Sequence, residues 1–256
     1  MTVVAPILIF VLLAAPALRL LLLASRTRQA PEVWGGLYFA GTAIGIPLRV
    51  VGNGVAIDDP ALAADLNTWG HVFFAGSTCA LALFTWRVFR PHARWANRLA
   101  PLSIASIVGM TVWTLATGAV SAERSISILL TNATRIVPLV WAFLESSRYW
   151  RVMRRRQALG LADPVVTNRF LLWALWTGAL TALPAMTLGL RVLARVADAL
   201  GLYGGADFSQ EPAVFVAVRA VFVLSAPIGA IALSLSFFPP ESYLRRVRER
   251  AAAAAG

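Results

Sequence analysis

The sequence GTAIGIPLRVVGN, from Gly41 to Asn53, lies within an apolar segment long enough to cross a lipid bilayer. It contains three glycines, a proline and an arginine, and each of these is costly or unusual inside a membrane helix. Such residues persist where a helix is bent, packs closely on a neighbour or binds something. The stretch therefore predicts a membrane helix with a specialised role.

The composition of the whole chain agrees with a membrane setting. Of its 256 residues, 59% are hydrophobic and 14% are charged, and the mean hydropathy is +0.71. Soluble domains carry about 25% charged residues. We expect an all-α integral membrane protein in which a single domain of seven transmembrane helices is followed by a basic tail over 239–256. The predicted spans are residues 3–24, 33–55, 68–89, 100–120, 125–149, 168–192 and 212–238.

The distribution of charge predicts the orientation. The chain has no lysine, so all 23 basic residues are arginines. Most of them lie in one set of connecting segments and in the tail, whereas the opposite connections are mainly acidic, with only Arg124 and Arg195 among them. Because positive segments stay in the cytoplasm, we expect the N-terminus outside and the C-terminus inside. The net charge of +11 then reflects topology, and nucleic acid is not an expected partner.

The tail PPESYLRRVRER predicts a short basic helix on anionic lipid of the inner leaflet. Arginine without lysine, together with abundant alanine, is typical of a GC-rich bacterial genome. We therefore expect a multi-pass protein of the bacterial cytoplasmic (inner) membrane.

A second stretch repeats the opening pattern. Gly41, Pro47 and Gly52 have the same Gly-x5-Pro-x4-Gly spacing as residues 178, 184 and 189. The match relates the second predicted span to the sixth and suggests three spans, a linker span and three more spans, a 3+1+3 parallel repeat. Corresponding prolines would bend both helices and open a cavity.

In topology this plan resembles the broad class of seven-span, N-outside membrane proteins, which includes microbial rhodopsins, SWEET-type sugar transporters and G-protein-coupled receptors. No motif identifies a family. The absence of lysine excludes a retinal Schiff base, and no other cofactor is expected. The sequence has no HExxH, GxSxG or paired-aspartate motif, and one cysteine with two histidines offers no clustered metal ligands, so neither an enzyme nor a metal site is predicted.

Polar groups in four spans give the candidate binding site. Three arginines, one histidine and two amides fall in the predicted outer half of the membrane, where we find no intramembrane carboxylate to neutralise them. Two alternatives would satisfy the cations without a ligand: acids of the outer loops, or snorkelling to headgroups. The third is a bound anion, for which the guanidinium fork is suited. The candidate ligand-binding residues are Arg49, Asn53, His71, Asn132, Arg135 and Arg219.

Three functions remain open. The first is a receptor-like or sensory protein that binds a small anionic or amphipathic ligand, or a lipid, in an outward-facing arginine-lined cavity and signals through a protein partner. The second is a transporter of an anionic solute built on the same cavity. The third is a non-catalytic subunit of a larger membrane complex, whose interface would use small-residue faces such as Gly36, Ala40 and 43–47.

Overall fold

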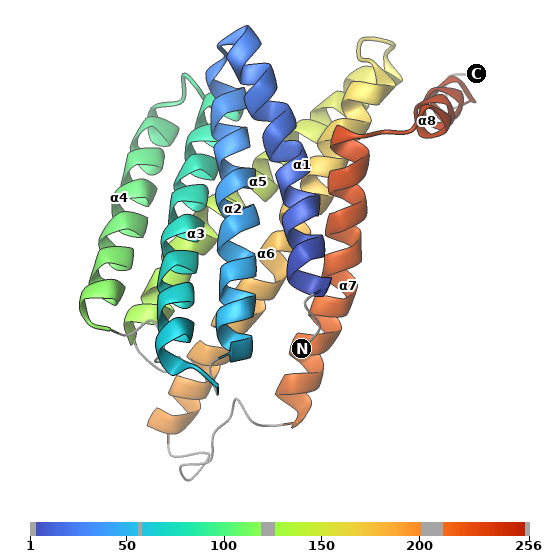
Figure 1. Ribbon diagram of the computed structural model, residues 1–256. Helices are drawn as coiled ribbons and strands as arrows, with labels where there is room; N and C mark the ends of the chain where they lie inside the picture. The colour runs from blue at the N-terminus through green and yellow to red at the C-terminus, as the bar shows by residue number, and fades with distance from the viewer. Residues whose placement is uncertain (1–3, 56–57, 119–125, 201–211, 254–256) are drawn as a thin grey trace. The chain divides into compact units, whose positions relative to one another are not determined.

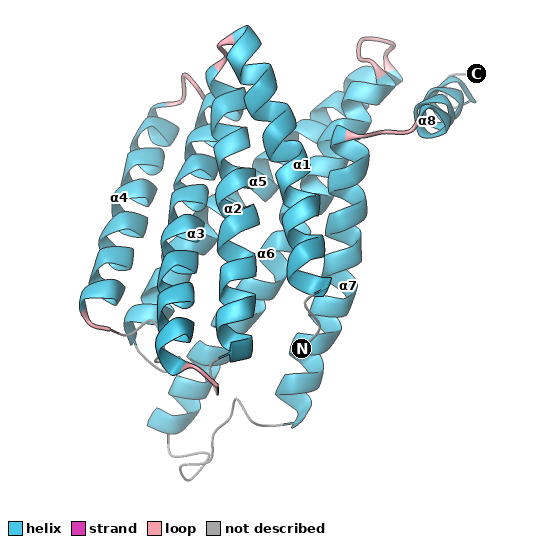
Figure 2. Cartoon of the chain, viewed as in Figure 1, coloured by secondary structure: helices cyan, strands magenta, loops and turns pink. Residues whose placement is uncertain are grey.

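The computed structural model describes residues 4–55, 58–118, 126–200 and 212–253, and the described chain is helical with no strand (Figures 1 and 2). The helices follow one another through short connections. They are α1 (Val4–Thr27), α2 (Ala30–Val55), α3 (Pro60–Phe89), α4 (Arg94–Ala116), α5 (Ile126–Ala158), α6 (Pro164–Ala199), α7 (Pro212–Phe237) and α8 (Glu241–Ala253).

Within the described residues, five helices are long and apolar enough to cross a membrane: α1, α3, α4, α5 and α6. A sixth counts if Val223–Phe237 of α7 and Glu241–Ala251 of α8, bent by 90°, are taken as one span. The helix α2 has the length for a span, but six glycines, Pro47, Arg49 and Asn53 reduce its apolarity. The predicted all-α class is thus confirmed, the apolar helices are consistent with a multi-pass membrane protein, and the number seven stays a prediction.

The chain forms two compact units, residues 1–138 and 139–256, and each is described by itself. In the first unit α1, α2, α3 and α4 stand side by side in chain order (Figure 1). The first turns of α5 complete this unit. The boundary falls at Pro138, inside α5, where the ring removes a backbone hydrogen bond of the helix.

Close approach of two helices explains the glycines of the opening stretch. A Cβ placed on Gly41 would lie 2.9 Å from the carbonyl oxygen of Phe73, and one on Gly45 would lie 3.0 Å from that of Gly70. The side chain of Asn67 lies equally close to Gly52. Because the numbers rise on α2 as they fall on α3, the helices run antiparallel. The glycines recur on one face and let two backbones touch.

The second unit packs its helices through aromatic side chains. The rings of Tyr149 and Phe170 join α5 to α6 with centroids 5.6 Å apart, and those of Trp173 and Phe237 join α6 to α7 at 6.0 Å. Gly178 lies against Phe143, whereas a Cβ on Gly189 would meet nothing within 4 Å among the described residues. The two glycines of the second stretch therefore have different surroundings, and the internal repeat stays a prediction.

Several helices extend beyond the predicted spans. Helix α3 begins at Pro60 where the hydropathy pattern predicts 68, and α6 covers Pro164–Ala199 where 168–192 is predicted. The reason is local. Asp163 and Asp59 each precede a proline and accept a hydrogen bond from a first-turn N–H, which starts the helix before its apolar run. The predicted tail helix is present as α8.

The cap of α3 gives the first test. The side chain of Asp59 accepts a hydrogen bond from the Leu62 N–H at 2.9 Å, and Pro60 fills the first helical position. Asp59→Ala is expected to lower the free energy of unfolding by about 1 kcal/mol, because the N–H loses its partner. Unfolding by sodium dodecyl sulfate in mixed micelles measures this change in the free energy of unfolding. Asp58→Ala, at the neighbouring acid outside the cap, is the control, and equal losses in both variants would contradict the cap.

Candidate functional site

The most buried cation of the described chain is Arg135, whose side chain is 2% exposed. Its guanidinium makes three hydrogen bonds to described residues of the first unit. Nη1 donates to Nδ1 of His71 at 2.7 Å, and Nη2 donates to the His71 carbonyl at 3.2 Å and to the Thr111 hydroxyl at 3.1 Å. The Phe74 ring lies below it, 5.6 Å from Cζ to centroid. Helices α3 and α4 thus clamp a side chain of α5.

The pairing fixes the state of the imidazole. Arginine carries only donors, so His71 Nδ1 accepts the bond. The ring is therefore neutral, with its proton on Nε2, and a second proton would set two cations 2.7 Å apart. His71 is 3% exposed and lies three turns into α3, deeper than the single turn expected from a span beginning at 68.

Each described hydrogen bond of Arg135 is to a neutral group. Among the described residues no carboxylate contacts the guanidinium, and its Nε–H is buried without a hydrogen-bond partner. A buried cation that keeps its charge needs compensation, and neutral acceptors and an aromatic face supply only part of it. The Nε–H and the positive charge of Arg135 are therefore available to an anionic group.

A second arginine lies beside the first. The stem of Arg49 crosses Gly70, where a Cβ would lie 2.5 Å from the Arg49 Cγ, and Gly70 is the neighbour of His71 in the chain. Arg135 is hydrogen-bonded to His71, so the Arg49 stem and the Arg135 guanidinium approach the same turn of α3. Two cations therefore share one region of the unit, and the absence of a side chain at Gly70 makes room for one of them.

The remaining predicted site residues do not join this cluster. Asn53 is exposed near the end of α2, and no described hydrogen bond links it or Asn132 to Arg135. Arg219 belongs to α7 of the other unit, and its side chain lies outside the described residues. The structure thus brings together Arg49, His71 and Arg135, three of the six candidates.

Threonines that the sequence did not single out complete the cluster. The hydroxyls of Thr114 and Thr131 lie 2.8 Å apart, both fully buried, and Thr131 also donates to the Met110 carbonyl at 3.1 Å. Thr111 and Thr114 are three residues apart on α4, while Thr131 and Arg135 are four apart on α5. This spacing places each pair on one helix face and is the sequence feature that could have predicted the cluster. The threonines join α4 to α5 beside the guanidinium.

No model of a known protein family matches this chain, and neither a curated protein nor a solved structure matches it.

Proposed function

We propose that this multi-pass membrane protein is a receptor-like protein that binds a small anion, or the anionic headgroup of a lipid, at the cluster of Arg49, His71 and Arg135. The observation that carries the proposal is the buried guanidinium of Arg135, which has neutral partners and an Nε–H without an acceptor among the described residues. A carboxylate or phosphate would neutralise the charge and accept the remaining donors. Arg49 would supply the second cation for the same ligand.

Because Arg135 is buried, binding of such a ligand would require the surrounding helices to move. A side chain 2% exposed is reached only when helices of the first unit move apart, so binding and movement are coupled. A receptor uses that coupling to change a surface elsewhere. We propose that the arginine-rich connections and tail, facing the cytoplasm of a bacterium, pass the change to a protein partner.

Native mass spectrometry of the full chain in mild detergent tests the proposal. Wild-type protein is expected to retain an anionic lipid or a small acid. The ligand occupancy of Arg135→Gln is expected to be at least about tenfold lower than that of wild type, because a hydrogen bond to a charged group contributes about 1.5–3 kcal/mol. Arg94→Gln, which removes an exposed arginine of α4, is the control and should keep the ligand. Equally empty wild-type and variant proteins would contradict ligand binding at the cluster, and a loss of stability in the empty variant would show that the cluster is structural.

A transporter of an anionic solute is the second candidate, and the position of Pro138 favours it. The proline lies inside α5 where the two compact units divide, and a helix that lacks a hydrogen bond at such a point is suited to bend during alternating access. Proteoliposomes decide between the candidates. Flux of the retained anion that falls in Arg135→Gln would support transport, and tight binding without flux would support the receptor.

The structure gives the third hypothesis, a complex subunit, no added support. The small residues that suggested an external interface are used within the first unit. Gly36 lies against Leu21 of α1, and Ala43 is 1% exposed.

A further inference from the structure

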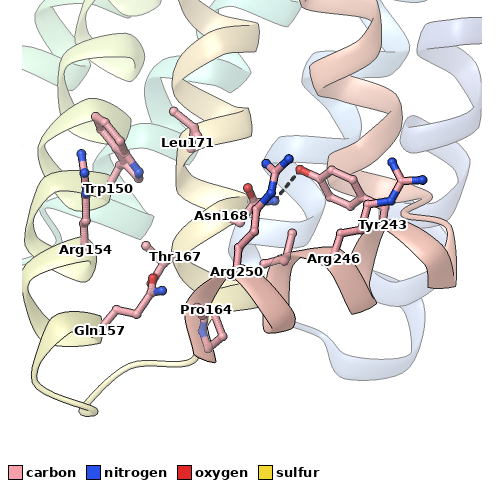
Figure 3. A pocket seen from close by; sticks show the side chains of 12 residues that line it. Trp150, Arg154, Gln157, Pro164, Thr167, Asn168, Leu171, Tyr243, Arg246 and Arg250 are labelled. Carbon is pink, nitrogen blue, oxygen red and sulfur yellow. Dashed lines mark hydrogen bonds between the residues drawn. The ribbon is translucent and has the colours of Figure 1, made fainter. Parts of the chain in front are cut away.

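A second basic site lies in the other unit and is lined by the end of α5, the start of α6 and one side of α8 (Figure 3). It is a pocket of about 460 Å³. Its lining combines four other polar side chains and an apolar wall with three arginines, Arg154, Arg246 and Arg250. Among the described residues that line it, none is acidic. A pocket of this composition is suited to an anion.

Local structure builds this pocket. Helix α5 ends at a turn in which Gly160 has a φ of 70° and the Leu161 N–H donates to the Arg156 carbonyl at 2.9 Å. Asp163 then caps α6, and the Tyr149 and Phe170 rings pair across the two helices. The short turn brings Trp150 and Arg154 of α5 next to the first turns of α6.

Helix α8 forms one wall of the open pocket. Tyr243, Arg246 and Arg250 recur at spacings of three and four residues, so they project from the same side of the helix. The Asn168 amide donates to the Tyr243 hydroxyl at 2.7 Å, which fixes α8 against α6 (Figure 3). The phenol keeps its own O–H as a donor for a ligand.

The opposite wall holds an arginine in place. The Arg154 guanidinium lies over the Trp150 ring, 5.7 Å from Cζ to centroid, which restricts a long side chain. An adjoining groove of about 430 Å³ adds Arg151 and Arg155. Positive charge therefore comes to the pocket from α5 and from α8, while indole, leucine and valine side chains provide an apolar surface.

We propose that this pocket binds the phosphate headgroup of an anionic phospholipid and so fastens α8 to the membrane surface. Guanidinium groups pair with phosphate oxygens through two parallel hydrogen bonds, and the apolar wall accepts the lipid's glycerol and first methylenes. Helix α8 lies at 90° to Val223–Phe237 of α7, the direction of a helix lying flat on a bilayer that α7 enters. The lipid belongs to the leaflet that the arginine-rich segments predict as cytoplasmic.

The test compares two double variants of α8 in the full chain. Arg246→Gln with Arg250→Gln removes the pocket arginines, and Arg245→Gln with Arg248→Gln removes the same charge from residues outside the lining. Each protein is incorporated into nanodiscs of phosphatidylcholine doped with phosphatidylglycerol, extracted in mild detergent, and its retained phosphatidylglycerol is counted by native mass spectrometry. We expect the pocket variant to lose at least about tenfold of the retained lipid, and the control to stay within about twofold.

Other outcomes overturn the proposal. Equal losses in both variants would indicate general attraction to a charged surface, and inorganic phosphate that displaces the lipid and binds in its absence would indicate a soluble phosphate site. Should the pocket variant unfold, Arg154→Gln on α5 repeats the comparison from a different helix. Because Arg135 belongs to the other unit, the comparison is repeated in the Arg135→Gln background, where retained phosphatidylglycerol is bound outside the Arg135 cluster, so the two proposals fail separately.

Discussion

Replacing His71 by leucine is expected to lower the free energy of unfolding by about 2–3 kcal/mol, the cost of removing a hydrogen bond to a buried charge. The imidazole accepts the 2.7 Å bond from Arg135 Nη1, and no other described acceptor is bonded to that nitrogen. The leucine fills space but leaves the cation with the carbonyl at 71 and Thr111. Unfolding by sodium dodecyl sulfate in mixed micelles gives the difference directly.

The second arm of this test removes the cation as well. A chain with both His71→Leu and Arg135→Met is expected to be more stable than His71→Leu alone, since the buried charge that needed the imidazole is gone. Thr111→Val, which removes a 3.1 Å bond, is the milder reference, with an expected loss of about 1–2 kcal/mol. Losses that simply add in the double variant would show that His71 and Arg135 do not depend on one another.

Composition alone was sufficient to predict the helical membrane class, because a run of about 20 apolar residues has few alternatives to a spanning helix. The caps at Asp59 and Asp163 were also visible in the sequence as Asp-Pro pairs, and they account for the early starts of α3 and α6. Hydropathy counts only the apolar run and so places these starts several residues late.

The glycines of α2 show what spacing leaves open. Gly41, Pro47 and Gly52 suggested a bent helix beside a cavity, whereas the structure uses Gly41, Gly45 and Gly52 as the contact with α3. The Gly41-x3-Gly45 pair is the pattern of close helix packing and carried this information. A single sequence does not show which neighbour meets that face.

The pairing of His71 with Arg135 is less accessible to sequence reasoning. Sixty-four residues separate them, and their contact depends on which faces α3 and α5 present to each other. Both were predicted as site residues because polar groups in membrane segments are rare. Thr111 and Thr131 were missed because threonine is common in apolar helices, where it bonds to its own backbone; Thr42 and Thr177 do so here.

The other large effect is expected at Gly70, where the two helices and the site meet. An alanine there would place its Cβ 2.9 Å from the Gly45 carbonyl oxygen and 3.2 Å from the Arg49 nitrogen, and both are backbone atoms that cannot turn aside. Gly70→Ala must separate α2 from α3, at a cost of about 1–3 kcal/mol. Gly76→Ala, on the same helix with nothing within 4 Å, should instead add about 0.5–1 kcal/mol of stability.

Gly70→Ala is expected to affect ligand binding as well as stability, because residue 70 precedes His71 and contacts Arg49. Moving α3 away from α2 shifts the imidazole and the Arg49 stem together, although neither is substituted. The anion retained by wild-type protein is therefore expected to be lost from Gly70→Ala as it is from Arg135→Gln, and kept by Gly76→Ala. Retention in a destabilised Gly70→Ala protein would mean that the α2–α3 contact supports the fold alone and that Arg135 binds without the geometry beside it.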